Sequence, residues 1–260
     1  MKKLLISLLA LVLLAGAVGL SVYALAPTWL ASLLATGVVG LFALYLLVDY
    51  GLGYMASAKT ARMPLPGDDL LAEQEKVLAF TKEIVIDAPP SQVWPYLKQQ
   101  GQNRGGFYSF VLLERIFTFD IRNTYTIEPK WQTLEPGDWI PYHQMGIGSE
   151  VMAVVDQQYF TMRSDTRRPP TGKKVKAFAL NIFPGGQFAW TWNFILQPLP
   201  DHKTHLIQRC HNYFTPTNLL TKGLILLFLG VPSLFMTTRQ MEVLKACAEG
   251  RVSAEGTIRK

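Results

Sequence analysis

The side chains best suited to ligand chemistry lie in residues 103–109, which read Asn-Arg-Gly-Gly-Phe-Tyr-Ser. Arg104 could present a guanidinium at the mouth of a cavity, since the two glycines after it let the backbone turn tightly. Tyr108 would add a polar hydroxyl. The alternative is structural, with Arg104 tying its loop to Glu114 or Asp120. Arg104 and Tyr108 are therefore candidate ligand-binding residues.

The histidines offer a second kind of chemistry, metal binding or proton transfer. The chain has four of them: His143, His202, His205 and His211. His205 and His211 share one face of an expected strand but lie too far along it to bind one ion. Because no ligand spacing is recognisable, we expect no metal and no other cofactor. His143 is a candidate polar residue that could form an acid/base pair with Asp138 or Glu150 only if the fold brings them together.

The remaining nucleophilic side chains and the glycine-rich stretch do not indicate a catalytic residue. Ser109 lacks the context of a nucleophile elbow, and residues 101–106 follow neither the dinucleotide-binding nor the phosphate-loop pattern. Cys210 and Cys247 have no metal-type spacing, and we expect both to be reduced, inert thiols. The sequence therefore favours binding over catalysis.

Aromatic side chains alternate along residues 187–196, which is the clearest strand pattern in the chain. Trp190, Trp192 and Phe194 fall on one face of that strand. Such a face lines a ligand pocket or forms core. We predict that the three do not share one role, and we include all three among the candidate ligand-binding residues.

The elements that position these residues begin with a change of period. Residues 83–87 contain a short β-branched run and are followed by a Pro-rich turn, which indicates a strand. From Ser91 to Gly101 the spacing is helical, and residues 108–117 predict a second short helix.

Further strands and one long helix follow along the chain. The expected strands are residues 139–142, 150–155, 159–164, 176–182, 187–196 and 204–213. A helix capped by Thr217 or Asn218 continues to Gly250 and is interrupted at Pro232. Its first half is almost wholly apolar. We nevertheless predict that residues 219–236 do not span a membrane, because residues 223–236 are too few for the roughly 20 that a bilayer requires.

The first 48 residues contain only Lys2 and Lys3 as charged side chains. Residues 4–26 and 30–48 are each about long enough to cross roughly 30 Å of hydrocarbon, and the short link at 27–29 forces an antiparallel hairpin. Positive charges at both ends predict that the amino terminus and the large domain are cytoplasmic. The alternative is a signal peptide that is cleaved before Pro27.

Composition agrees with an anchored domain. The chain has 260 residues, of which 49% are hydrophobic and 17% charged, and a formal net charge of +6. The Lys and Arg residues are scattered, without a basic helix or an RNA-binding signature, so we expect an anionic lipid surface and no nucleic acid as the partner. The sequence leaves the oligomeric state open.

The strand, Pro-rich turn, short helix and Arg-Gly-Gly-Phe-Tyr-Ser segment of residues 82–109 resemble the opening of the START/Bet v1-like (SRPBCC, polyketide cyclase/dehydrase) superfamily. Two later places are also similar, the 120–138 stretch with Trp131-Gln132 and Gly137-Asp138, and Met241-Glu242. Trp131 joins the candidate ligand-binding residues on this ground. The chain resembles the membrane-attached bacterial branch of the superfamily.

The resemblance implies an α+β helix-grip fold, with a curved antiparallel sheet around a long C-terminal helix. We expect a transmembrane helical hairpin at residues 1–50, a linker at 51–80, the helix-grip domain at 81–250 and a tail at 251–260. The superfamily binds hydrophobic ligands, and only some members are enzymes. We expect an inner-membrane, multi-pass protein whose cytoplasmic domain binds a membrane lipid or another apolar small molecule. The alternatives are a cyclase/dehydratase-type enzyme and a structural or partner-binding protein with a filled cavity.

Overall fold

The computed structural model describes residues 28–116, 118–168, 170 and 186–259. The chain divides into two compact units, Met1–Gly53 and Tyr54–Lys260. Each unit is described by itself.

The first unit contains one described helix, α2 (Thr28–Leu46), which continues into the π-helical turn η1 (Leu47–Gly51). Leu33, Val39 and Leu41 are exposed. A helix that is apolar on all sides lacks the polar face expected of an ordinary surface helix. The predicted helix at 30–48 is thus present, whereas the predicted span at 4–26 lies outside the described residues, so a two-helix hairpin is not shown.

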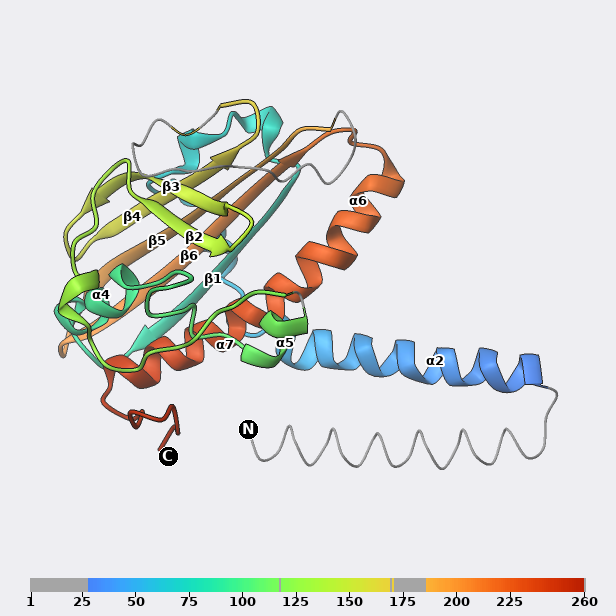
Figure 1. Ribbon diagram of the computed structural model, residues 1–260, viewed down its shortest axis with the longest axis horizontal. Coiled ribbons are helices and arrows are strands. Elements are labelled where there is room, and N and C mark those ends of the chain that lie inside the picture. The colour runs from blue at the N-terminus through green and yellow to red at the C-terminus, as the bar shows by residue number, and fades with distance from the viewer. Residues whose placement is uncertain (1–27, 117, 169, 171–185, 260) are drawn as a thin grey trace. The chain divides into compact units, whose positions relative to one another are not determined.

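The second unit is an α+β structure built on one curved, six-stranded antiparallel sheet (Figure 1). The strand order is β1-β6-β5-β4-β3-β2. The strands are β1 (Leu78–Ile86), β2 (Trp139–His143), β3 (Ile147–Val155), β4 (Tyr159–Asp165), β5 (Phe188–Leu199) and β6 (Lys203–Phe214). The strands predicted at 83–87, 139–142, 150–155, 159–164, 187–196 and 204–213 are all confirmed, although β1 begins earlier than predicted. The strand predicted at 176–182 lies outside the described residues.

The helices of this unit include one long element at the carboxyl end of the chain. They are α3 (Ala58–Arg62), α4 (Pro90–Lys98), α5 (Val111–Ile116), α6 (Leu219–Ile225) and α7 (Val231–Ala248), with the π-helical turn η5 (Leu226–Gly230) between the last two. Together α6, η5 and α7 form one helix, Leu219–Ala248, which is long and apolar enough by length and composition to cross a membrane. Asn218 caps it by accepting a hydrogen bond from the Thr221 backbone N–H.

The sequence predicted that Pro232 interrupts the long helix, and the structure does not show this interruption. Pro232 lies in the first turn of α7, and the helix is continuous through it. Inside a continuous helix a proline lacks one N–H donor and crowds the preceding turn, and the π-helical turn η5, where the hydrogen-bond pattern departs from that of an α-helix, lies directly before it. The irregularity is instead the π-helical turn η5, which the apolar sequence does not reveal.

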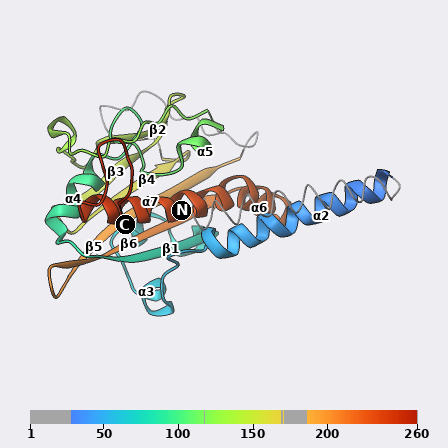
Figure 2. The same ribbon diagram turned by 90° about the horizontal axis from the view of Figure 1, so that it is seen from below.

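Residues 54–77, within the predicted linker, are folded onto the sheet. Arg209 is buried and donates hydrogen bonds to the carbonyl oxygens of Thr60, Ala61 and Met63, and it forms an ion pair with Asp68 at 2.7 Å. Side chains alternate along β6, so Arg209 points away from the face that carries α7. Figure 2 shows α3 on the side of β1 away from α7. Of the predicted linker at 51–80, only residues 51–53 belong to the first unit.

The main core lies between the sheet and the second half of the long helix. Met241 and Leu244 of α7 are fully buried against Phe160, Phe194 and Trp94 in one cluster. The helix therefore packs on the sheet through α7.

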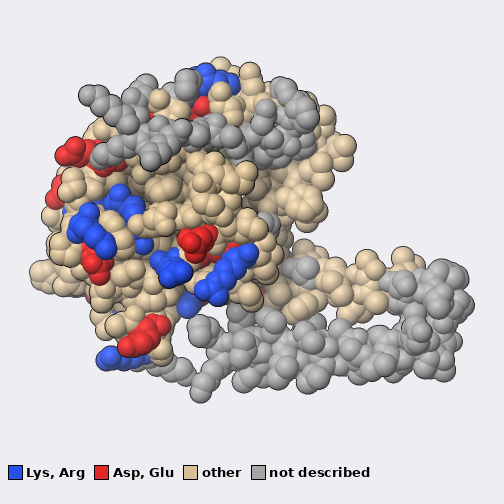
Figure 3. Space-filling model, in the orientation of Figure 1, with Lys and Arg blue, Asp and Glu red and all other residues tan. Residues whose placement is uncertain are grey.

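On the face shown in Figure 3, basic and acidic side chains are interspersed.

Candidate functional site

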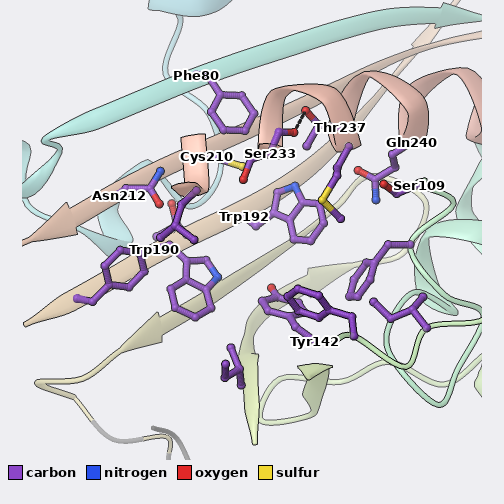
Figure 4. A pocket seen from close by; sticks show the side chains of 18 residues that line it. Phe80, Ser109, Tyr142, Trp190, Trp192, Cys210, Asn212, Ser233, Thr237 and Gln240 are labelled. Atoms are coloured by element: carbon purple, nitrogen blue, oxygen red, sulfur yellow. Dashed lines mark hydrogen bonds between the residues drawn. The ribbon is translucent and has the colours of Figure 1, made fainter. Parts of the chain in front are cut away.

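A cavity of about 270 Å³ opens between the sheet and the middle of the long helix (Figure 4). The sheet contributes residues from β1, β2, β3, β5 and β6, and the segment around α5 closes a further side. The helix contributes Leu229, Ser233, Met236, Thr237 and Gln240. The volume is near the lower limit of the roughly 300–1,000 Å³ of typical small-molecule sites. It suits a small ligand or the end of a longer chain.

Aromatic rings form most of the cavity wall. Phe107 stacks on Trp192 with ring centroids 5.6 Å apart, and Tyr142 lies 5.9 Å from both Trp190 and Trp192. Phe188 packs on Trp190 at 5.3 Å. Rings packed in this way give a wall that is apolar over most of its area.

Tyr142 is a ring of the wall whose hydroxyl is hydrogen-bonded to the sheet. Its hydroxyl donates a 2.7 Å hydrogen bond to Ser149 Oγ, and Ser149 contacts Ser164 at 3.2 Å. Burial raises the pKa of Tyr142 well above the usual range. The phenol therefore stays protonated at physiological pH and acts as a neutral group.

A buried chain of three amides joins the sheet, the helix and the segment after α4, and its middle member lines the cavity. Gln208 of β6 donates to Gln240 Oε1 at 3.0 Å, and Gln240 donates to Gln100 Oε1 at 2.6 Å. All three side chains are buried, and Gln240 lines the cavity. Because Gln240 is held at both ends, it is a fixed polar point in the wall.

None of the 18 side chains that line the cavity within the described part of the chain is charged. On the face of the sheet that carries the helix, a buried cation, Lys82, lies two residues after the wall residue Phe80 on β1. Its ammonium donates to Leu234 O at 2.9 Å and to Thr238 Oγ1, both on α7. Burial lowers the pKa of Lys82 to about 8. Lys82 thus joins the sheet to the helix.

The three aromatic candidates on β5 have different positions. Trp190 and Trp192 are half-buried and line the cavity. Phe194 is fully buried and stacks on Phe160 with centroids 5.0 Å apart, inside the core. Alternation places all three on one face, but only the two tryptophans border a void.

Arg104 and Trp131 lie outside the set of cavity-lining residues. Arg104 Nη2 donates to the carbonyl oxygens of Lys98 and Trp131, at 2.8 and 3.2 Å. The Trp131 ring lies beneath the Lys130 ammonium at 4.5 Å. Arg104 therefore ties its loop to neighbouring segments, although the partners are backbone carbonyls and not the carboxylates of Glu114 or Asp120.

Tyr108 and His143 are also absent from the cavity wall. The Tyr108 hydroxyl accepts a 2.7 Å hydrogen bond from Gln99 Nε2 in the domain interior. His143 Nε2 lies 3.1 Å from Thr118 Oγ1, and its Nδ1 accepts from the Met145 backbone N–H. Both ring nitrogens are therefore engaged away from Asp138 and Glu150.

Sequence reasoning missed several residues of the wall. Tyr142, Gln240 and Ser109 line the cavity, as does the buried free thiol of Cys210. Burial raises the pKa of the Cys210 thiol, so it is an inert wall group. The one sequence signal for this wall was Gln240, a glutamine in a largely buried part of a helix, because such a side chain needs polar partners.

Comparisons with known proteins do not assign the site. No family model and no curated protein matches the chain. Among solved structures, the chain is similar to MLL2253 from Mesorhizobium loti, with 17% identity and a TM-score of 0.35 over 66% of this chain and 98% of that one. It is similar to a protein from Arthrobacter aurescens, with 13% identity and a TM-score of 0.37 over 70% and 92%. CalU16 from Micromonospora echinospora gives 13% identity and a TM-score of 0.29 over 66% and 84%. Scores this low carry no argument about family or activity.

Proposed function

We propose that the second unit binds an apolar small molecule in the cavity between the sheet and the long helix. The observation that carries the proposal is the wall itself, which is aromatic and aliphatic over most of its area and has no charged side chain in the described part of the chain. Apolar ligands gain free energy at roughly 25 cal/mol for each Å² removed from water. A partly open apolar cavity offers that gain.

We further propose that this unit is a helix-grip domain of the START/Bet v1-like superfamily. The support is the order of its elements along the chain, a first strand, short helices, an antiparallel meander and a long last helix. The enzyme alternative has less support, since Arg104, Tyr108 and His143 are absent from the cavity wall. The alternative of a filled interior is disfavoured by the cavity volume.

The third part of the proposal is attachment to the cytoplasmic face of the inner membrane by an N-terminal helical hairpin. Apolar residues 4–26 and helix α2 support it, as do the positive charges at Lys2, Lys3, Lys59 and Arg62. The long helix exposes Leu227 and Phe228, 59% and 58% accessible, just before its cavity-lining turns. This surface would let a ligand pass between bilayer and cavity with little contact with water.

Native mass spectrometry of the full chain, purified in detergent, tests the binding function. We expect a co-purifying apolar small molecule, and we expect Ser233→Phe, which projects a ring into the cavity, to remove it. Ser91→Phe, at an exposed position, is the control. A chain that retains no small molecule and takes up no added long-chain alcohol or lipid would contradict the proposal.

Reporter fusions test the topology separately. A fusion after Arg62 should be inactive with alkaline phosphatase and fluorescent with a cytoplasmic reporter, because the positive-inside rule keeps Lys59 and Arg62 in the cytoplasm. Alkaline phosphatase activity, or a mature chain that begins at Pro27, would contradict the hairpin.

A further inference from the structure

Three of the cavity-lining residues have a buried side-chain donor with no acceptor among the described residues: Ser109, Thr191 and Trp192. Thr191 alternates with Trp190 and Trp192 along β5, so its hydroxyl belongs to the opposite face of the sheet. The donors on the cavity side are therefore the hydroxyl of Ser109 and the indole N–H of Trp192. Ser109 is only 7% exposed. A buried polar group without a partner costs roughly 1–3 kcal/mol in free energy of folding, and a ligand oxygen in the cavity would supply the missing acceptor.

The two donors come from different elements and face the same cavity (Figure 4). Ser109 precedes α5, in a segment held by Asn123, whose amide oxygen accepts from the Tyr108 N–H at 2.8 Å. Trp192 is fixed on β5 by its ring contacts with Phe107 and Tyr142. Both donors are thus positioned before a ligand arrives, which lowers the entropic cost of binding.

The rest of the wall limits the charge of the ligand. An ionised carboxylate or phosphate inside the cavity would have no cationic lining side chain in the described part of the chain, and an unpaired buried charge is far more costly than a neutral polar group. The ammonium of Lys82 is directed to Leu234 O and Thr238 Oγ1 on α7. A neutral acceptor such as a carbonyl or hydroxyl oxygen fits the two donors without this cost.

We propose that the ligand is an uncharged amphiphile whose carbonyl or hydroxyl oxygens accept hydrogen bonds from Ser109 and Trp192 inside the cavity. This inference rests on the proposed binding function and specifies its ligand class. It places the polar end of the ligand inside the protein and excludes anionic amphiphiles such as ionised fatty acids.

Photo-crosslinking of the full chain in detergent tests the ligand class. The probes are diazirine-bearing analogues of 2-decanone, 1-decanol, decane and decanoate, used at about pH 8, where an ordinary carboxyl is ionised. The yield on cavity peptides is normalised to the yield on α2, which reports partition into the detergent. We expect the ketone and alcohol to label the cavity at concentrations at least tenfold lower than decanoate. They should also label it at concentrations roughly three- to tenfold lower than decane.

Variants identify the donors. Ser109→Ala and Trp192→Phe should each weaken labelling by the ketone roughly three- to tenfold while leaving that by decane nearly unchanged. Trp94→Phe is the matched control, because Trp94 Nε1 is also buried without a partner but lies in the core. Ser91→Ala is the control for the serine.

The outcomes separate this inference from the function on which it rests. If no probe labels the cavity, the binding function fails. If decane and decanoate label it as well as the ketone, the binding function stands and the inference is overturned. Preferential labelling by decanoate that is lost in Lys82→Met would also overturn it, by showing that the ammonium reaches the ligand.

Discussion

Strand β5 has two ends on the face that carries the long helix, and they differ in what lies opposite. At the closed end, Phe194 stacks on Phe160, and Trp94 meets Phe160 edge-on with centroids 6.0 Å apart. Met241 and Leu244 of α7 fill the space beside them. This end is ordinary close-packed core.

At the open end, Trp190 and Trp192 face the cavity. The helix there presents Ser233 and Thr237 inward, while Leu227 and Phe228 are turned outward and exposed. The same alternation along one strand therefore gives core or cavity according to the helix residues opposite. The void lies beside the small side chains of Ser233 and Thr237, and Leu229 and Met236 of the same helix also line it.

The largest expected effect comes from truncating one ring at each end. Phe194→Ala should lower the free energy of unfolding by about 3–5 kcal/mol, because it leaves a cavity in close-packed core. Trp192→Ala should cost less, about 1–2 kcal/mol, because its ring already borders a void. Urea unfolding of the detergent-solubilised chain measures both, and ligand retention should fall mainly in Trp192→Ala. Equal losses of stability with unchanged ligand retention would mean that the two ends do not differ.

Glu114 tests whether a buried group outside the cavity wall affects stability without affecting ligand binding. Its carboxyl is fully buried, and neither oxygen has a partner among the described residues. Burial raises the pKa of Glu114 to about 7. The folded state thus holds its proton more tightly than the unfolded state, and its contribution to stability is lost as the pH rises from about 4.5 through 7. Glu114→Gln should therefore stabilise the chain by about 2 kcal/mol at about pH 8 and by little near pH 4.5.

Thermal unfolding of Glu114→Gln at the two pH values checks this expectation. Glu135→Gln, at an exposed position, is the matched control. Ligand retention should not change, since Glu114 is not among the cavity-lining residues and Gln has nearly the same size. A stabilisation that is independent of pH would contradict the account.

The effect expected at Lys82, at the border between the two ends, is no larger than that at Glu114 and has the opposite dependence on pH. The pKa of Lys82 is lowered from 10.5 to about 8 by burial, so the folded state releases its proton at a lower pH than the unfolded state does. The stability of the wild type should consequently rise between about pH 8 and pH 10.5 relative to Lys82→Met. Urea unfolding across that range measures the difference, with Lys59→Met, at an exposed lysine, as the control. Parallel pH profiles for the wild type and Lys82→Met would show that the folded state does not perturb this amine.

Much of the sheet could be predicted because its signal is local. Alternation in β5 and β6 and the cap at Asn218 depend on residues close together in the chain. The fold of residues 54–77 could not be predicted, because it depends on Arg209, which lies 141–149 residues away from the groups of this segment that it binds.

The candidate site was harder to predict than the sheet. Trp190 and Trp192 were found from alternation, but a void depends on the rotation of a helix that the sequence specifies only through tertiary packing. Arg104 and His143 are of types that often take part in binding or catalysis. In the structure Arg104 is hydrogen-bonded to backbone carbonyls and His143 to Thr118. Residue type shows what a side chain can do, and only its partners show what remains free.

The most direct test of the central claim is fluorine NMR of the full chain labelled with 5-fluorotryptophan and titrated with 1-decanol. Single Trp→Phe variants assign the resonances. The account predicts that the signals of Trp190 and Trp192 shift with saturation, while that of Trp94, in the closed end, does not. Saturable shifts at Trp94, or none at Trp190 and Trp192, would contradict the assignment of an open, ligand-binding end and a closed core end.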